Sequence, residues 1–407
     1  MPIFNSLGSN YKFREVLIAS LLCFSSQQEA QYKTILKKLE RYFQGKAILL
    51  HNGRDAIEYC LTAYNISTND QVLTQAFSCS SIEEAIHRVG AQACYFDLAP
   101  GKIKTTLKQV KKSYNKAKQP KAVILQHTLG YQDEVAEIAR FCQENNLLLI
   151  ADLAQAVGAT GSNNQPLGME ADAVVLSFGR DKVVDAITGG AVLFRKQPKK
   201  LPELKKFQSS EKNTLSFKKT LYPFFTWVVR KTYSICLGKV LHWFFKKLDL
   251  TQTSIKSPHQ NYQPLPINLP ILLLDAWNQL ETQLDHRRQL AYYYFNQIKQ
   301  NKKIVVPVET GEIKKGTNLR FPVLVQSGKH LQSLLNYLAK HQIYLLDRWY
   351  KKPVDSGSLR FKSDYQPGSC PEAEKMSQVI INLPTHQNIS LADAEKITKL
   401  INLWSLT

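Results

Sequence analysis

The sequence has few acidic residues for its length. Its 407 residues include 33 Asp and Glu but 53 Lys and Arg, a formal net charge of +20 at pH 7. The excess lies mainly in two segments, since residues 101–121 hold eight lysines and no acid, and residues 199–256 hold thirteen Lys or Arg against three acids. A localised basic surface attracts nucleotide diphosphates, anionic lipid or nucleic acid, although a solvated lysine-rich face explains the same pattern equally well.

Other common signatures are missing as well. The seven cysteines form no CxxC pair, which argues against a disulfide framework or a zinc site and favours a reducing cytosol. The sequence contains no GxGxxG, no internal repeat and no uninterrupted apolar run of the ~20 residues that a membrane span needs. The mostly apolar stretch 16–24 lacks a small-residue cleavage site, so we expect no signal peptide and a cytoplasmic protein.

What the sequence does contain is a regular alternation of short apolar runs and amphipathic segments. The seven apolar runs cover residues 47–50, 71–73, 93–96, 122–125, 147–150, 173–176 and 191–194. Helical patterns separate most of them, for example at residues 55–64, 81–89 and 133–144. This alternation predicts an α/β fold with a mostly parallel sheet, and such sheets bind ligands beyond the carboxyl ends of their strands.

Polar residues stand where several of these runs end. The turn 51–55, His-Asn-Gly-Arg-Asp, opens a helix, and free backbone N–H groups at such a position suit a phosphate. Asp152 follows the fifth run and Ser177 the sixth, with Lys182 five residues further on. Pyridoxal phosphate chemistry needs such a pair, because a lysine amine forms a Schiff base with the aldehyde while a carboxylate keeps the pyridine nitrogen protonated. Either residue alone is more commonly a surface cap.

The length and the change of pattern predict two domains. We expect a large pyridoxal-phosphate-binding α/β domain over residues 1–265 and a smaller α+β domain over residues 266–407. The smaller domain should hold helices at 269–294, 330–341 and 391–403 and strands at 303–307, 320–325 and 344–346.

Residues 199–262 interrupt the alternation with basic and aromatic sequence. Two aromatic clusters, 221–231 and 241–247, each end in adjacent basic residues. One interpretation is a pair of amphipathic helices in peripheral contact with anionic lipid at the inner face of the membrane. The other is an arm that packs on a partner subunit or covers the substrate.

Several motifs together resemble the DegT/DnrJ/EryC1/StrS aminotransferases, a family of fold-type I pyridoxal phosphate enzymes. The matching segments are 42–45, 52–56, 151–159, Ser177-Phe178 with Lys182 and Gly189-Gly190, 370–374, and 382–386. The resemblance covers roughly residues 40–195 and 266–405. It implies a three-layer transferase fold, pyridoxal 5'-phosphate as cofactor, no metal, and a homodimer.

The resemblance also implies an activity and roles for individual residues. An amino acid, glutamate by analogy, would give its amino group to a keto-sugar carried on a nucleotide, for cell-surface polysaccharide or amino-sugar biosynthesis. Lys182 would bond the cofactor aldehyde and then move the proton, and Asp152 would pair with the ring nitrogen. Gln155 would hydrogen-bond the ring hydroxyl, and the phosphate would be held by Gly53, Arg54 and Ser177.

The sequence departs from the family pattern at several places. Cys79 stands where the family often stacks an aromatic side chain on the cofactor ring, so any stacking would pass to Phe77. Thr188 replaces a glutamate, and an Asn-Tyr-Arg element that reaches the neighbouring subunit is reduced to 268–270, Asn-Leu-Pro.

Arg180 and Asp181, beside the lysine, are also unusual. They could tune the amine, bind a substrate carboxylate or form a simple ion pair.

Two other functions are compatible with the departures from the family pattern. A membrane-associated relative could act on a lipid-linked precursor, and a non-catalytic relative could use the basic arm for binding. The presence of Lys182 argues against the second, because a degenerate enzyme has no need of that amine.

Overall fold

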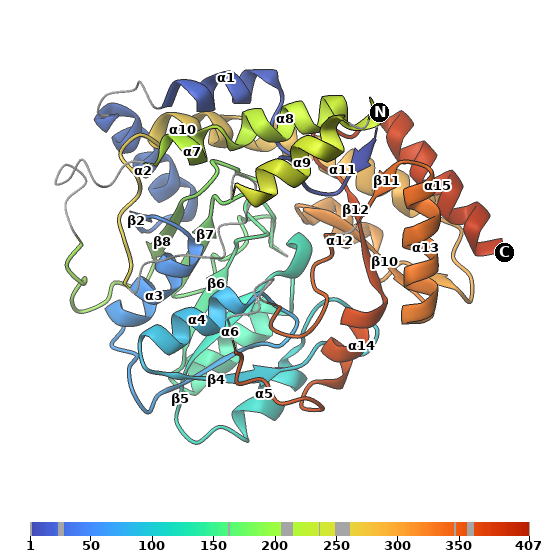
Figure 1. The fold of residues 1–407 in the computed structure, drawn as a ribbon. Coiled ribbons are helices and arrows are strands. Elements are labelled where there is room, and N and C mark those ends of the chain that lie inside the picture. Colours follow the sequence, from blue (N-terminus) through green and yellow to red (C-terminus); the bar gives the residue numbers. More distant parts are fainter. Residues whose placement is uncertain are drawn as a thin grey trace.

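The computed structural model describes residues 2–22, 28–161, 163–204, 215–235, 237–248, 261–345, 347–355 and 362–406. Within these residues a large central sheet with helices on both faces lies beside a smaller sheet covered by the last helices of the chain (Figure 1).

The central sheet consists of the seven runs that the sequence predicts. In chain order the strands are β2 (Lys46–Leu50), β3 (Gln71–Gln75), β4 (Gln92–Phe96), β5 (Pro120–Gln126), β6 (Leu148–Asp152), β7 (Ala173–Ser177) and β8 (Gly190–Phe194). Their order in the sheet is β2-β8-β7-β6-β5-β3-β4, and β8 runs antiparallel to both neighbours while the other pairs are parallel. The predicted α/β fold class is confirmed.

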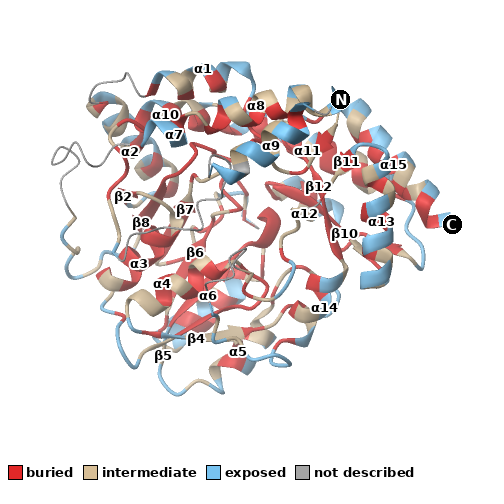
Figure 2. Cartoon of the chain, viewed as in Figure 1, coloured by how far each residue is buried: buried red, intermediate tan, exposed pale blue. Residues whose placement is uncertain are grey.

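The sheet is the middle of three layers because both of its faces are apolar. In β7, Ala173 and Val175 face the core formed with α3 (Gly53–Ala63) and α4 (Ser80–Arg88). Val174 and Leu176 face the opposite core, which includes α2 (Glu29–Phe43), α5 (Leu107–Tyr114) and α6 (Val135–Glu144). Alternate residues of a strand point to opposite sides, so continuous apolar runs are what a doubly covered sheet requires. Figure 2 shows the inner strands such as β7 as mainly buried, whereas the edge strand β4 is mostly intermediate.

The smaller sheet has the order β12-β10-β9, with β9 at Ile304–Val305, β10 at Arg320–Val325 and β12 at Ile380–Pro384. The helices of this part are α11 (Leu280–Gln297), α12 (Thr310–Lys315), α13 (Gly328–Lys340), α14 (Pro371–Val379) and α15 (Leu391–Leu406). A separate two-stranded sheet pairs β1 (Ile3–Phe4) with β11 (Ile343–Tyr344), so the start of the chain lies against its last third.

Some expectations for this part are wrong. The single helix predicted at 269–294 is two helices, α10 (Pro270–Asn278) and α11, because Gln279 adopts φ −94° and ψ 2° and breaks the helix. The break lets α10 pack into the core of the large sheet while the later part of α11 packs into the smaller core. The strand predicted at 344–346 overlaps β11 (Ile343–Tyr344), which pairs with β1 in the two-stranded sheet. The division of the chain into two domains at residue 265 stays a prediction.

In the described part of residues 199–262 the α-helices, which we call the arm, are α7 (Phe217–Thr220), α8 (Tyr222–Thr232) and α9 (Leu237–Lys247). Helix α8 packs against α1 (Phe13–Leu21), and α9 packs on α8. At Gly8, with φ 68°, an added Cβ would lie 2.1 Å from the hydroxyl oxygen of Thr226, so only glycine allows this approach of α8. Among the described helices, none combines the length and apolarity that a bilayer span requires.

Arg287 joins the two parts of the molecule. Its buried guanidinium donates hydrogen bonds to the Leu319 carbonyl (3.1 Å), the Thr385 hydroxyl (3.2 Å) and the Asn10 side chain (2.8 Å). Burial lowers the pKa of Arg287 to about 10. A buried charge is tolerated because these acceptors replace its water.

We therefore expect Arg287→Ala to lower the free energy of unfolding by roughly 3–5 kcal/mol, since three buried acceptors lose their donor. Urea unfolding followed by circular dichroism measures this change. The control is Arg140→Ala on the exposed side of α6, which should stay within about 0.5 kcal/mol of the parent. Equal effects of the two substitutions would contradict a linking role for Arg287.

Candidate active site

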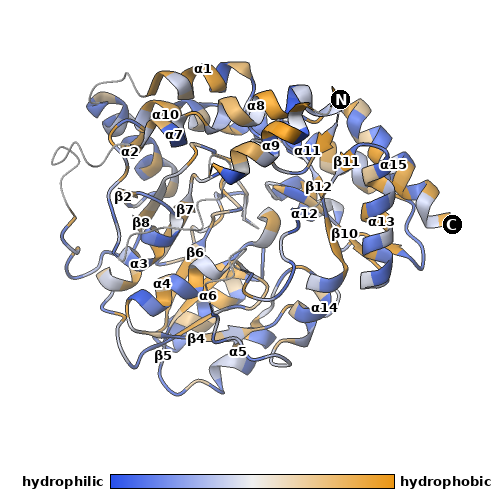
Figure 3. Cartoon of the chain, in the orientation of Figure 1, coloured by the Kyte–Doolittle hydropathy of each residue, from blue (hydrophilic) through white to orange (hydrophobic). Residues whose placement is uncertain are grey.

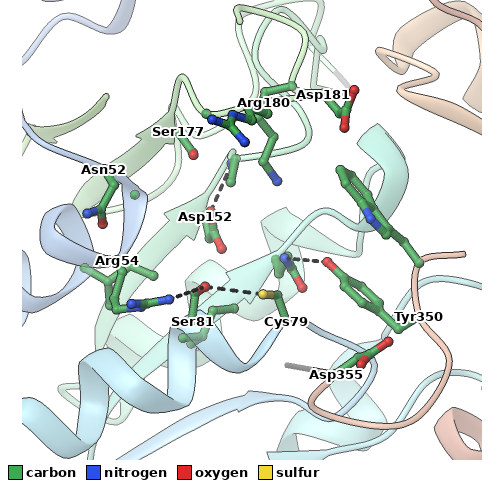
Figure 4. Close-up of a pocket in the computed structure, with 18 of the residues that line it drawn as sticks. Asn52, Arg54, Cys79, Ser81, Asp152, Ser177, Arg180, Asp181, Tyr350 and Asp355 are labelled. Carbon is green, nitrogen blue, oxygen red and sulfur yellow. Dashed lines mark hydrogen bonds between the residues drawn. The ribbon is translucent and has the colours of Figure 1, made fainter. Parts of the chain in front are cut away.

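A cavity of about 420 Å³ lies at the carboxyl ends of β5, β6 and β7. The N-terminus of α3 and the start of α4 form one part of its wall, and residues 347–351 with Asp355 form another. Figure 4 shows Asp152, Ser177 and Arg180 in this cavity, with Tyr350 and Asp355 approaching from a different segment. The cavity thus lies where a parallel sheet is expected to bind its ligand.

Lys182 lies in the irregular segment that follows β7. Its side chain lines the cavity, and its amine is 4.7 Å from the centre of the Trp349 ring. Burial lowers the pKa of Lys182, while the charges of Cys79 and Asp152 act in the opposite direction. A lysine held this way has a larger neutral fraction than an exposed one, as nucleophilic attack requires.

Asp152 is the last residue of β6 and is only 2% exposed. One of its carboxylate oxygens accepts a hydrogen bond from the Ala154 N–H at 2.9 Å. Burial raises the pKa of Asp152, and the Ala154 hydrogen bond and the charges of Lys182 and His127 partly offset this rise. A cationic partner in the cavity would stabilise the ionised carboxylate.

In the turn before α3 the backbone lies very close to the ends of β7 and β8. Asn52 caps the helix by accepting a hydrogen bond from the Asp55 N–H at 2.9 Å. An added Cβ on Gly53 would lie 2.9 Å from the Cβ of Ser177, and one on Gly190 would lie 2.4 Å from the Asn52 carbonyl. These contacts bring the α3 N-terminus beside Ser177, so backbone N–H groups and a hydroxyl face the same space.

Arg54 extends from the same turn and is largely buried. Its Nε lies 3.0 Å from a carboxylate oxygen of Glu84, and its Nη2 donates to the Ser81 hydroxyl at 3.4 Å. The Glu84 carboxylate neutralises part of its charge. Ser81 and its neighbour Cys79 also line the cavity.

Gln155 is the one predicted residue that does not line the cavity. The other five do: Gly53, Arg54, Asp152, Ser177 and Lys182. The amide oxygen of Gln155 accepts a hydrogen bond from the Leu129 N–H at 2.7 Å, and its Nε2 donates to the Tyr350 hydroxyl. Tyr350 itself lines the cavity. The expected hydrogen bond between Gln155 and the ring hydroxyl of pyridoxal phosphate stays a prediction.

Sequence reasoning missed Trp349 and Tyr350. They belong to an irregular segment far along the chain, with no strand end or motif to mark them. Cys79 lines the cavity, whereas Phe77, to which ring stacking was expected to pass, is fully buried and packs edge-on against the Tyr350 ring.

The arm contributes to the cavity wall. The ring of Tyr222, from the start of α8, lies 3.5 Å from the guanidinium carbon of Arg180, and both residues line the cavity. Stacking of this kind holds an arginine guanidinium in place at the wall of the cavity.

The first residues of the chain hold the lysine segment in place. Ser9 donates to Asp181 (2.6 Å), Asn10 donates to the Lys182 carbonyl (2.7 Å) and to Asp185 (3.2 Å), and Tyr11 also donates to Asp185. We call residues 8–11 the N-terminal strap. Burial and the neighbouring Asp181 charge raise the pKa of Asp185 from 3.8 to about 6.

These residues fit pyridoxal phosphate. The fit rests on the close approach of Gly53 to Ser177 at a helix N-terminus, a buried carboxylate, and a desolvated lysine, all in one cavity. An anionic phosphate, a protonated ring nitrogen and an aldehyde are the groups that such a set binds. Fold and site together indicate a pyridoxal-phosphate-dependent transferase of the mostly parallel-sheet class.

Comparison with known sequences identifies the family. Residues 25–218 and 271–402 match the DegT/DnrJ/EryC1/StrS aminotransferase family, and the chain belongs to it. The predicted family, the aminotransferase class and the cofactor of the family, pyridoxal phosphate, are confirmed. The unmatched residues 219–270 include most of the arm.

Individual relatives are distant. A GDP-perosamine synthase from Vibrio cholerae is 27% identical over 36% of this chain, and the match spans 39% of that protein. A dTDP-3-amino-3,6-dideoxy-alpha-D-galactopyranose transaminase from Aneurinibacillus thermoaerophilus is 25% identical over 87% of this chain and 84% of its own length. The crystal structure of ntda from Bacillus subtilis with bound cofactor PMP shares the fold, with 18% identity, a TM-score of 0.73 and coverage of 98% and 84% of the two chains.

The pKa of Asp185 predicts a pH dependence of stability. Because the native state holds this proton more tightly than the unfolded chain, the protonated form contributes stability that is present below pH 3.8 and is lost as the pH rises through about 6. The shift corresponds to roughly 3 kcal/mol.

We expect Asp185→Asn to flatten the decrease in unfolding free energy between pH 4 and 7, as measured by urea midpoints of parent and variant. Parallel pH profiles of the two proteins would show that Asp185 does not titrate in this range.

Proposed function

We propose that this protein transfers an amino group from an amino acid, with glutamate as the preferred donor, to a keto-sugar carried on a nucleotide. The observation that carries the proposal is the meeting of Lys182, Asp152 and the α3 N-terminus in one cavity. Family membership supplies the reaction class.

Pyridoxal phosphate, when bound, supplies an aldehyde that reacts with amines and a ring that withdraws electrons from the carbon being deprotonated. In our proposal Lys182 is the amine that holds the cofactor covalently and that afterwards moves the substrate proton. Its lowered pKa supports both tasks, because the neutral amine is the reactive form. Asp152 keeps the ring nitrogen protonated, and its burial makes this ion pair strong.

We assign the phosphate to the backbone N–H groups at Gly53, the Ser177 hydroxyl and the Arg54 guanidinium. The short distance between Gly53 and Ser177 supports this assignment. Arg54 acts here mainly as a hydrogen-bond donor, since Glu84 already balances much of its charge. Trp349 and Tyr350 cover the other side of the cavity and limit the access of water.

The substrate class rests on charge and on the relatives. The names of two relatives refer to sugars carried on GDP or dTDP. Arg180 and Lys351 line the cavity as cations, and Arg180 is held by the Tyr222 ring, so we propose that they bind the diphosphate. A place in cell-surface polysaccharide or amino-sugar biosynthesis follows from this substrate class.

We also propose a homodimer, by analogy with fold-type I enzymes, whose sites usually form at a subunit interface. The predicted peripheral contact with an anionic membrane would not involve the cavity, because the exposed apolar residues of α9 do not line it.

Replacing Lys182 by alanine should abolish the visible absorption band of the cofactor-loaded protein and the mass that borohydride reduction fixes to the chain, because the amine that we assign to the cofactor aldehyde is lost. Absorption spectra and intact mass measure these changes. Lys121→Ala, at the exposed amino end of β5, is the matched control and should retain both signals. A Lys182→Ala protein that still fixes the cofactor would refute the assignment.

Replacing Asp152 by alanine should leave some cofactor binding but slow the reaction with the amino donor at least about 100-fold, because the ring nitrogen loses its proton. The measurement is the loss of visible absorbance when L-glutamate is added to the loaded protein. Asp172→Asn, beside the opposite end of β7, should react at the parental rate. If neither the parent nor Asp172→Asn responds to any amino acid tested, amino transfer itself is wrong.

A further inference from the structure

The outer side of α9 is apolar although it faces solvent. Val240 is 61% exposed, Trp243 64% and Phe244 47%, and Leu237 and Leu248 are exposed to similar extents. Their spacing of three, four and seven residues places them on one side of the helix. Figure 3 shows this apolar stretch along α9. A continuous exposed patch of large side chains on a soluble domain marks a site of interaction.

The inner side of α9 packs against α8, and this packing holds the outer side of α9 toward solvent. The Phe245 ring lies 4.7 Å from that of Phe225 on α8. At Gly238 an added Cβ would lie 2.5 Å from the Val229 carbonyl, so the two helices touch through their backbones there. Helix α8 in turn is anchored by Arg230, which donates to the carbonyls of Gly8 and Tyr11.

The charge around this patch is of one sign. Between residues 212 and 248 the sequence contains no Asp or Glu but eight basic residues: Lys212, Lys218, Lys219, Arg230, Lys231, Lys239, Lys246 and Lys247. Lys239 and Lys247 are exposed on α9, and the amine of Lys247 lies 5.4 Å from the centre of the Trp243 ring. Apolar and cationic groups therefore share one face of the helix.

We propose that the outer face of α9 docks on the surface of a membrane that contains anionic lipid. Tryptophan and phenylalanine enter the boundary between headgroups and acyl chains, while lysines pair with lipid phosphates. With 11 residues α9 is too short to span a bilayer, for which about 20 are needed, so it lies parallel to the surface. The proposal does not depend on the reaction catalysed in the cavity.

A second copy of this chain fits the face less well. In a symmetric dimer built on this patch the same surface would face itself, so the cations of one copy would lie close to those of the other, and residues 212–248 contain no acid to pair with them. An anionic lipid surface satisfies both the apolar and the charged residues of the face.

The test is binding of the full chain, loaded with cofactor, to vesicles of phosphatidylcholine with about 30% phosphatidylglycerol and to vesicles of phosphatidylcholine alone. Co-sedimentation should show binding to the first at about 0.1 M NaCl, and at least tenfold weaker binding at about 0.5 M NaCl. Binding should also shift the tryptophan emission to shorter wavelength. Absence of binding to anionic vesicles at low salt overturns the proposal.

Three variants separate the contributions. Trp243→Ser/Phe244→Ser should bind at least tenfold more weakly and lose the emission shift, and Lys239→Gln/Lys247→Gln should lose about fivefold per lysine. Leu403→Ser on α15, which is as exposed as Phe244 at 47%, should bind like the parent. Circular dichroism confirms that each variant is folded.

Sedimentation velocity gives the alternative outcome. If Trp243→Ser/Phe244→Ser converts a dimer to a monomer while vesicle binding is unchanged, the face is a subunit interface and the proposal is wrong. A parental oligomeric state together with lost vesicle binding supports docking on lipid.

Discussion

The placing of Lys182 and Asp152 in one cavity, with the carboxylate fully buried and the amine partly so, is the constraint on which the rest of the site depends. Burial acts in opposite directions on the two groups, since it lowers the pKa of the amine and raises that of the carboxyl. The sheet provides the geometry, because β6 and β7 are adjacent parallel strands and their carboxyl ends meet at one edge. The strap and the segment 347–351 then close the space around them. The pKa values of the two reactive groups therefore depend on the walls of the cavity as well as on the groups themselves.

Much of the fold could be predicted because a sheet covered on both faces leaves a plain signal. All seven apolar runs became strands of the central sheet, with ends that shifted by one or a few residues. The failures lie where tertiary contacts decide the outcome. Gln279 breaks a helix whose sequence pattern is continuous, and the break lets α10 pack into the core of the large sheet while the later part of α11 packs into the smaller core. β11 pairs with β1 from the far end of the chain, and no local pattern specifies that partner.

The site could be predicted where it follows strand ends and glycine turns. Gly53, Arg54, Asp152, Ser177 and Lys182 all line the cavity. Trp349 and Tyr350 could not be found in this way, since they come from an irregular segment that folds over the cavity only in three dimensions. Gln155 was given a role from its motif, yet its amide lies against Tyr350, a neighbour that the motif does not contain. The sequence pattern marks the arm as an interruption of the strand–helix alternation. It does not indicate that Tyr222 of the arm contacts Arg180.

The strap also has a consequence for the order of assembly during folding. Asn10 bonds the backbone of Lys182, receives a hydrogen bond from Arg287 at 2.8 Å, and is contacted through its carbonyl by Gln387. Residues separated by more than a hundred positions along the chain must therefore meet at one point. Contacts that join such distant positions form late in folding. The backbone of Lys182 therefore reaches its final surroundings only when the segment around Gln387 has packed against Asn10.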